Sequence, residues 1–339
     1  MTFQAKFKGA SQSDMKIAMV GCGALGSYYG AKLSRDGQEV HFLLRSDYEV
    51  VRRRGVFIRS PEGDFHVQPK CAKTSPDIGV SDLVIIGLKS TANHEFSKLL
   101  PPLVGPATAV LTLQNGMGNE EQLARLFPVE QILGGLCFVC LNRIEPGIIH
   151  HLDHGRVVLG EFQRWPEPRT HDIATMFRHA GIPCNVTDNL ARAHWEKLVW
   201  NIPFNGLGVA SAAGLDALLK GKLVARAELG PCLATDKLLA DPQWERLVGE
   251  LMHEVIAAAN ALGFKVETAL AEKQMERTRT MGTYKASTLI DFERGQPLEL
   301  ESLFCEPMRQ AVEAGVNVPR WQALCEILQQ LDPARVPAK

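Results

Sequence analysis

The chain has no excess of charge of either sign and no long hydrophobic run. It carries 37 basic and 38 acidic residues among 339, a formal net charge of −1. We therefore expect neither nucleic acid nor an anionic membrane surface as a partner. No apolar run approaches the roughly 20 residues that span a bilayer, and the first residues lack the apolar core of a signal peptide. These absences predict a cytoplasmic protein that is not bound to a membrane.

The cysteines are too widely spaced for a disulfide framework or a metal centre. Among eight, only Cys137 and Cys140 form a CxxC pair. That pair lies in the apolar run 132–141, where a strand would turn residues three apart to opposite faces. No second CxxC and no nearby pair of histidines accompanies it. The sequence predicts buried, reduced thiols and no metal.

What the sequence does have is an apolar strand that leads directly into a glycine-rich turn. Residues 16–26 read KIAMVGCGALG, which contains the GxGxxG pattern. In this pattern the first glycine allows a tight turn, the second lets the backbone approach a pyrophosphate, and the third lets a helix pack on the strand. The helix N-terminus then offers free N–H groups to the phosphates. A merely structural turn is the alternative. The predicted dinucleotide ligands are Gly21, Cys22, Gly23, Ala24, Leu25 and Gly26.

The order of the apolar segments predicts two domains. A chain of 339 residues exceeds what one hydrophobic core usually holds. From residue 16 onward, short strands alternate with helical segments, which is typical of a Rossmann-type, doubly wound α/β sheet. We expect an added hairpin at 56–67, and antiparallel strands at 133–141, 147–152 and 157–162. The predicted divisions are a flexible extension at 1–14, a dinucleotide-binding domain at 15–188 and an all-helical substrate and catalytic domain at 189–335.

Helical spacing dominates after Asp188. Apolar residues recur there at intervals of three and four. The expected helices are 190–219, 223–240, 244–262, 269–281, 298–314 and 321–331.

The residue that ends the second expected strand indicates which dinucleotide fits. An acid that binds the ribose of NAD usually stands about 20 residues past the glycines. Here Arg45 stands there, and a guanidinium can pair with a 2′-phosphate through two hydrogen bonds. This favours NADP (NADPH) over NAD. In the alternative, Arg45 is a solvated charge and Asp47 is the ribose ligand.

Two further loops leave the carboxyl ends of expected strands, where ligands of open α/β sheets collect. One carries Lys89, and the other is QNGMG at 114–118. Its glycines permit unusual backbone angles, and Asn115 offers both a donor and an acceptor. We predict Lys89 and Asn115 as cofactor ligands. Both loops can also be read as ordinary strand-ending turns.

One helix of the second domain carries a narrow polar stripe. Lys197, Asn201 and Asn205 fall at intervals of four, so they share one face. Such a stripe in an apolar helix is typical of the wall of a ligand pocket. Pro203 should bend this helix. The alternative is a helix edge with a snorkelling lysine and two asparagines bonded to backbone.

These motifs, in this order, resemble the ketopantoate reductase family (2-dehydropantoate 2-reductases). The resemblance covers residues 16 to about 331. It rests on GCGALG, on LK at 88–89, on QNGMG, on the KxxxNxxxN series from Lys197, and on STLIDFERGQPLE at 287–299, which is similar to the family's SMxQDxxxGxxTE.

The resemblance implies roles for individual residues. Lys197 would be the general acid that protonates the keto oxygen of the substrate while NADPH delivers hydride. Glu299 would stand beside this lysine, and the substrate would be held by Asn115, Asn201, Asn205 and Ser287. Desolvation makes an ammonium a stronger acid, and Trp195, Trp200 and Phe204 are the aromatic residues that could supply it.

Other interpretations of the last two residues stay open. Glu299 would fall in the first turn of a helix opened by Pro297, where any acid stabilises the helix dipole. Glu301 is a neighbouring rival for its role. Ser287 could be the N-cap of a helix that runs toward Glu293.

The tail segment departs from the family pattern, and most departures surround the expected substrate side. They are Thr288, Ile290, Leu298, Glu301, Phe304, Cys305 and Pro307. The main hypothesis is NADPH-dependent reduction of a 2-keto acid, first of all 2-dehydropantoate to pantoate in pantothenate biosynthesis. The alternatives are a related dehydrogenase of another keto or hydroxy acid and a non-catalytic NADPH-sensing protein. A homodimer also stays open, because the apolar face of Leu247, Leu251 and Val255 fits packing within the chain or between copies.

Overall fold

The computed structural model describes residues 15–220 and 228–335. The extension expected at 1–14 and the start of the helix expected at 223–240 lie outside these ranges. The chain forms two compact units. The first runs to Asn115 and resumes from Asn119 to Leu190, and the second consists of Gly116–Gly118 and the residues from Ala191 onward. The sequence predicts a single boundary near Asp188, whereas in the structure three residues, Gly116–Gly118, also belong to the second unit.

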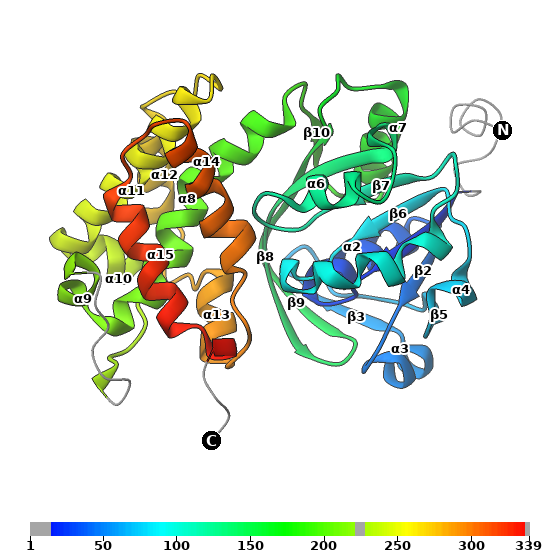
Figure 1. The fold of residues 1–339 in the computed structure, drawn as a ribbon. Helices are drawn as coiled ribbons and strands as arrows, with labels where there is room; N and C mark the ends of the chain where they lie inside the picture. Colours follow the sequence, from blue (N-terminus) through cyan, green and yellow to red (C-terminus); the bar gives the residue numbers. More distant parts are fainter. Residues whose placement is uncertain (1–14, 221–227, 336–339) are drawn as a thin grey trace. The chain divides into compact units, whose positions relative to one another are not determined.

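A mixed sheet forms the centre of the first unit (Figure 1). Its order is β4-β3-β9-β8-β7-β6-β1-β2-β5, with β10 paired to β9. Neighbours from β5 to β8 run parallel, whereas the pairs β8–β9 and β3–β4 are antiparallel. The strands are β1 (Lys16–Val20), β2 (Glu39–Leu43), β3 (Val56–Arg59), β4 (Phe65–Val67), β5 (Lys70–Ala72), β6 (Leu83–Ile86), β7 (Ala109–Thr112), β8 (Ile132–Glu145), β9 (Ile148–Glu161) and β10 (Cys184–Val186).

Helices pack on both faces of the parallel strands. Ile17 and Met19 of β1 belong to one hydrophobic core, while Ala18 and Val20 belong to the core on the opposite face. This double burial explains why the parallel strands are continuously apolar in the sequence. The α-helices and 3₁₀ turns are α2 (Ala24–Arg35), α3 (Tyr48–Arg54), α4 (Ser75–Ile78), η2 (Ser90–Glu95), α5 (Phe96–Leu99), η3 (Pro101–Leu103), α6 (Asn119–Ala124), η4 (Val129–Gln131) and α7 (Pro168–His179).

The predicted Rossmann-type fold class and the hairpin at 56–67 are confirmed. The prediction of three separate strands between 133 and 162 is wrong. β8 and β9 are two long strands of 14 residues each, and β9 continues where turn residues were expected. It continues because bulges absorb the irregular residues, of which Gly155 has a φ of +136°.

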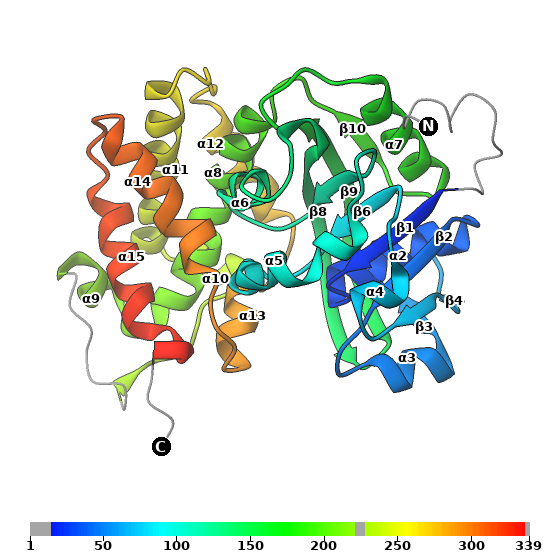
Figure 2. The same cartoon turned by 45° about the vertical axis from the view of Figure 1, so that its right-hand side comes forward.

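The bulges bend the β8–β9 hairpin so that its tip lies beside α3. Pairing between the two strands shifts register at Phe138/Val139, Cys140/Leu141 and Arg143/Glu145. At the tip, the carbonyl of Gly147 accepts a hydrogen bond from the N–H of Phe57 at 2.8 Å. Both views show this curved hairpin ending beside α3 (Figures 1 and 2). Helix α2 contacts β1 and β2 but also β8 and β9, so the sheet curls around it.

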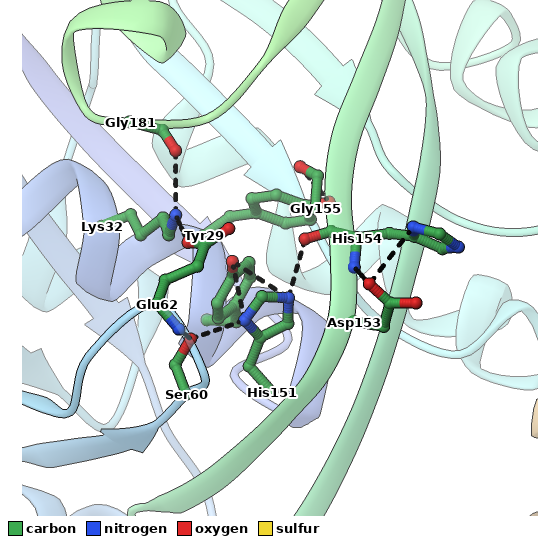
Figure 3. A network of polar contacts seen from close by, with 10 residues as sticks. Tyr29, Lys32, Ser60, Glu62, His151, Asp153, His154, Gly155 and Gly181 are labelled. Atoms are coloured by element: carbon green, nitrogen blue, oxygen red, sulfur yellow. Dashed lines mark hydrogen bonds and ion pairs between the residues drawn. The ribbon is translucent and has the colours of Figure 1, made fainter. Parts of the chain in front are cut away.

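A buried polar network fastens α2 to the bulged part of β9 (Figure 3). The ring of His151, only 1% exposed, lies 4.6 Å from that of Tyr28. Its Nδ1 is 2.8 Å from the Ser60 hydroxyl and its Nε2 is 2.8 Å from the carbonyl of His154. A carbonyl only accepts, so Nε2 carries the proton and the Ser60 hydroxyl donates to Nδ1. Alongside, the Tyr29 hydroxyl donates to the carbonyl of Gly155 at 3.3 Å.

The second unit is helical and is centred on α8. Its core contains Trp195, Trp321 and Phe204. Leu247, Leu251 and Val255 are buried in this same core, so the face on which a homodimer was considered packs within the chain. The elements are α8 (Leu190–Ala210), η5 (Ser211–Ala213), α9 (Leu215–Lys220), α10 (Thr235–Ala240), α11 (Pro242–Ala261), α12 (Leu270–Arg279), α13 (Ser287–Glu293), the π-helical η7 (Glu301–Cys305), α14 (Glu306–Glu313), α15 (Pro319–Leu331) and η8 (Pro333–Arg335).

Two helices expected in this unit are not regular. The helix expected at 190–219 ends at Ala210 and resumes at Leu215, because Gly214 between them has a φ of +85°. The helix expected at 298–314 contains the π-helical turn η7, directly before Pro307 at the start of α14. Proline has no N–H to donate to the preceding turn, which accounts for irregularity at this point. No helix of the residues described is long and apolar enough to cross a membrane.

Replacing His151 should destabilise the protein. In His151→Ala the Ser60 hydroxyl and the carbonyl of His154 lose their partner, and a void opens beside Tyr28. We expect the free energy of unfolding to fall by about 2–3 kcal/mol in urea denaturation followed by circular dichroism. The exposed His94 offers the control, because His94→Ala should change it by less than about 0.5 kcal/mol. Equal effects of the two substitutions would contradict a structural role for this network.

Candidate active site

The glycine turn has the geometry that its spacing predicts. Gly21 has a φ of +94°, and a Cβ there would lie 2.4 Å from the Leu88 nitrogen. A Cβ on Gly26 would lie 2.2 Å from the carbonyl oxygen of Gly21. At Gly23, by contrast, no described atom lies within 4 Å of the Cβ position. The fold itself therefore requires glycine at positions 21 and 26, whereas Gly23 leaves its backbone open to a ligand.

The start of α2 suits a phosphate. Gly23 is the N-cap residue, and the first turn of the helix contains no acidic side chain. The N–H groups of this turn and the positive end of the helix dipole therefore meet no opposing charge from the helix itself. Cys22 lies within the turn. Burial is the main cause that raises the pKa of its thiol, and the nearby Cys71 and Asp47 raise it further. The thiol therefore stays protonated at neutral pH.

The two candidates at the end of β2 are in different situations. Arg45 is exposed, and no carboxylate among residues 15–220 and 228–335 forms an ion pair with it. Asp47 is only 7% exposed, and the guanidinium of Arg143 holds it through contacts of 2.6 Å to Oδ1 and 2.7 and 3.0 Å to Oδ2. The carboxylate considered as a ribose ligand is therefore already bound.

The loops after β6 and β7 are joined by amide side chains that the sequence analysis did not single out. Gln114 donates to Asn93 at 2.7 Å, Asn93 donates to Asn119 at 2.9 Å, and Asn119 donates to the carbonyl of Asn115 at 3.1 Å. Lys89 lies exposed at the start of the first loop, and Asn115 is half-buried at the start of the second. This chain of hydrogen bonds fixes the backbone on which Asn115 stands.

After Asn115 the chain enters the second unit through two glycines in left-handed conformations. Gly116 has a φ of +86° and Gly118 one of +84°, as expected for this loop. A Cβ on Gly116 would lie 2.4 Å from the carbonyl of Ser302, and the N–H of Met117 donates to that carbonyl at 2.8 Å. Glycine is thus needed for the loop to lie against η7.

The polar stripe of α8 lies in an apolar helix as predicted, and the helix continues through Pro203. Lys197 is half-buried, Asn201 is 7% exposed and Asn205 is 3% exposed. The Oδ1 atom of Asn205 accepts hydrogen bonds from the Ser287 hydroxyl at 3.2 Å and from the N–H of Thr288 at 3.1 Å. The structure therefore brings together Asn205 and Ser287, two residues that are 82 positions apart.

Ser287 is not a helix N-cap. Ala286 has the N-cap position of α13, and Ser287 is the first helical residue. The Asn205 side chain caps this helix instead, because it accepts from the N–H of Thr288.

Donors and acceptors remain available along the stripe. Within the described part of the chain, neither the Asn201 amide nor the Nδ2 of Asn205 has a hydrogen-bond partner. These amide atoms are not among the fully buried side-chain atoms that lack a partner, so they can bond to water or to a ligand. The interpretation of these asparagines as bonded to backbone therefore holds for Asn205, which accepts from the N–H of Thr288, and not for Asn201.

Glu299 and its rival Glu301 differ in environment. Glu299 is 5% exposed and directly precedes the helical turn that begins at Leu300, so the expected first turn opened by Pro297 does not form. The side chain of Glu301 is 70% exposed and forms an ion pair with Arg309. Of these two acids, the buried one is the better candidate for a role beside a ligand.

Comparisons with known proteins identify the family of the chain. Residues 17–164 match the family model "Ketopantoate reductase PanE/ApbA", and residues 229–332 match its C-terminal counterpart. A 2-dehydropantoate 2-reductase of Nostoc sp. is 40% identical over 326 residues, 94% of this chain and 96% of that protein. The chain belongs to the ketopantoate reductase family.

Solved structures of similar fold include a family member and a more distant enzyme. The crystal structure of 2-dehydropantoate 2-reductase from Geobacter metallireducens has a TM-score of 0.84 and 44% identity, and the match covers 93% of this chain and 99% of that one. A structure of D-mandelate dehydrogenase with NADH and anilino(oxo)acetate has a TM-score of 0.78 over 94% of this chain and 98% of that one. At 18% identity, the second match shows a shared fold alone.

The three glycines of the turn can be tested separately. Gly23→Ala should change the free energy of unfolding by less than about 1 kcal/mol, yet weaken binding of a dinucleotide at least about tenfold, because the methyl group fills the open approach. Gly21→Ala should lower the free energy of unfolding by about 1–3 kcal/mol through strain and collision with Leu88. Thermal melting and fluorescence titration measure both effects. Undiminished binding by Gly23→Ala would place the pyrophosphate elsewhere.

Proposed function

We propose that this chain reduces 2-dehydropantoate to pantoate with NADPH, a step of pantothenate biosynthesis. The observation that carries the proposal is the stripe of Lys197, Asn201 and Asn205, an acid and two buried amides with hydrogen-bonding capacity left, on a helix whose other residues from 198 to 210 are apolar. Membership of the family and the 40% identity with the Nostoc reductase support it. A non-catalytic NADPH sensor would have no use for such a stripe.

The first unit supplies the proposed cofactor site. The open backbone at Gly23 and the acid-free first turn of α2 suit the pyrophosphate, and the exposed Arg45 suits the 2′-phosphate. We assign Lys89 and the loop of Asn115 to the same site because they follow β6 and β7 at the carboxyl edge of the sheet. Bound NADPH supplies a hydride to the carbonyl carbon of the substrate.

The second unit supplies the proposed acid. As the carbonyl carbon accepts hydride, negative charge develops on the keto oxygen, and the Nζ of Lys197 donates a proton to it. Lys197 is half-buried on α8, and a positioned ammonium can act as a general acid. Glu299, buried in the same unit, would orient the ammonium and accept a hydrogen bond from it or from the substrate.

The remaining polar groups would hold the substrate. The Asn201 amide and the Nδ2 of Asn205 can bond to its carboxylate and hydroxyl oxygens, while Ser287 is kept in place by Asn205. Asn115 would contribute from its fixed backbone. Reduction of another 2-keto acid remains the alternative, and oxidation of NADPH with a panel of keto acids distinguishes the substrates.

The proposal places the enzyme in the cytoplasm. All eight cysteines are free thiols, which is typical of compartments that keep thiols reduced. A homodimer also stays a prediction, and sedimentation measurements would test it.

Lys197→Ala should lower turnover by about 10²- to 10⁴-fold, the usual contribution of a general acid, with little change in the affinity for NADPH. Steady-state kinetics and cofactor titration measure the two quantities. Lys273, exposed on α12, is the matched control, and Lys273→Ala should leave both unchanged. Turnover that survives in Lys197→Ala would show that another group protonates the substrate.

Arg45→Ala should weaken NADPH by about ten- to a hundredfold and NADH much less, because only NADPH has the 2′-phosphate that the guanidinium would bind. Arg53 on the exposed face of α3 provides the control, since Arg53→Ala should leave both dissociation constants nearly unchanged. Equal weakening of the two cofactors by Arg45→Ala would contradict the assigned role.

A further inference from the structure

A buried carboxylate lies at the place where the preference between NADPH and NADH is decided. Asp47 follows β2 by four residues and takes the N-cap position of α3, yet its side chain does not cap that helix. Instead, both of its carboxylate oxygens accept hydrogen bonds from Arg143. The Ser46 hydroxyl also donates to its Oδ1 at 2.9 Å. An acid near this position is what ordinarily binds the ribose hydroxyls of NAD.

The Asp47 carboxylate is close enough to act on the dinucleotide turn. β1 and β2 are neighbours with Val20 paired to Leu43, so the glycine turn and the loop that carries Arg45 and Asp47 leave adjacent strands at the same edge. In addition, the charge of Asp47 contributes to the raised pKa of the Cys22 thiol, after the larger effects of burial and Cys71. An uncompensated negative charge on Asp47 would therefore make the electrostatic potential at the cofactor site more negative.

Arg143 reaches this place because of the bent hairpin. It lies near the end of β8, which is separated from β2 by β7, β6 and β1 in the sheet. The register shifts between Phe138 and Glu145 curl the hairpin, and its tip is hydrogen-bonded to β3 at Phe57 and ends beside α3 (Figures 1 and 2). The curl brings the guanidinium to Asp47 across 96 positions of sequence.

We propose that Arg143 sets the preference for NADPH by holding Asp47. The inference rests on the proposed function, since it concerns the same cofactor site. While Arg143 binds both carboxylate oxygens, Asp47 neither repels a 2′-phosphate nor accepts hydrogen bonds from the ribose hydroxyls of NADH. The charge of Arg45 then remains for the phosphate. Arg143 is a positioning residue that acts through Asp47 and does not itself contact the cofactor.

The charge balance makes the proposal specific. With the pair intact, the loop has the charge of Arg45 alone, because Asp47 and Arg143 cancel. Without Arg143, the freed carboxylate opposes Arg45 and weakens attraction of a doubly negative phosphate. It also gains the freedom to bind two ribose hydroxyls, which favours NADH. Removal of the carboxylate as well should therefore restore the original preference.

The test measures dissociation constants of NADPH and NADH by fluorescence titration of the full chain, without substrate. The ratio of the two constants should shift toward NADH by at least about tenfold in Arg143→Gln, equivalent to about 1.4 kcal/mol. In the double variant Asp47→Asn with Arg143→Gln, the ratio should return to within about threefold of the wild-type value, because the amide carries no charge. Arg59→Gln, an exposed arginine of β3 in the same unit, is the control and should leave the ratio unchanged.

Three outcomes overturn the inference. An unchanged ratio in folded Arg143→Gln shows that Arg143 does not set the preference. A double variant that keeps the shift of the single variant shows that Arg143 acts on the cofactor directly and not through Asp47. If Arg143→Gln does not fold, Arg143→Lys replaces it, since lysine keeps the charge but cannot form the two-pronged contact. It should shift the ratio by a smaller factor, and an unshifted ratio contradicts the proposal. Failure of the wild type to bind NADPH would instead contradict the proposed function.

Discussion

Backbone contact at the glycine turn is the constraint on which the first unit depends. Gly26 lies so close to the carbonyl of Gly21, and Gly21 so close to Leu88, that no side chain fits at either position. These contacts fix the start of α2 against β1 and against the loop after β6. The strand order reverses direction at this point, with β2 on one side of β1 and β6 on the other. The open backbone of Gly23 therefore faces the edge where ligands of such sheets bind.

Local patterns allowed the fold class, the turn and the α8 stripe to be predicted. The glycine spacing, the alternation of strands and helices, and the four-residue interval from Lys197 to Asn205 are each set by residues near in sequence. The contact of Asp47 with Arg143 was not predictable in this way, since 96 positions separate them. Nor was the continuation of β9 through the bulge at Gly155, because a glycine there reads equally well as a turn. The crossing of Gly116–Gly118 to the second unit depends on packing against Ser302, which no local pattern reports.

Two sets of buried polar side chains differ in how their hydrogen bonds are satisfied. His151 is bonded at both ring nitrogens, which fits a structural role at the bulge of β9. Asn201 and the Nδ2 of Asn205, among the described residues, have no such partners. The amide atoms of Asn201 and Asn205 are not among the fully buried atoms that lack a partner, so the α8 stripe keeps hydrogen-bonding capacity for a ligand or for water. This difference separates a candidate site from a polar core more clearly than residue type does.

The ion pair of Asp47 and Arg143 also matters through what is left when one partner is missing. A partly buried pair contributes little net stability, because desolvation of both charges offsets most of their attraction. Its stronger consequence is asymmetric, since removal of one partner leaves the other charge uncompensated near the glycine turn. The bulges bend β8 and β9, and the His151 network holds those bulges to α2. Both features thereby affect the charge of the loop after β2, which carries Asp47. Cofactor preference in this chain is then a property of the curled hairpin as well as of the residue that ends β2.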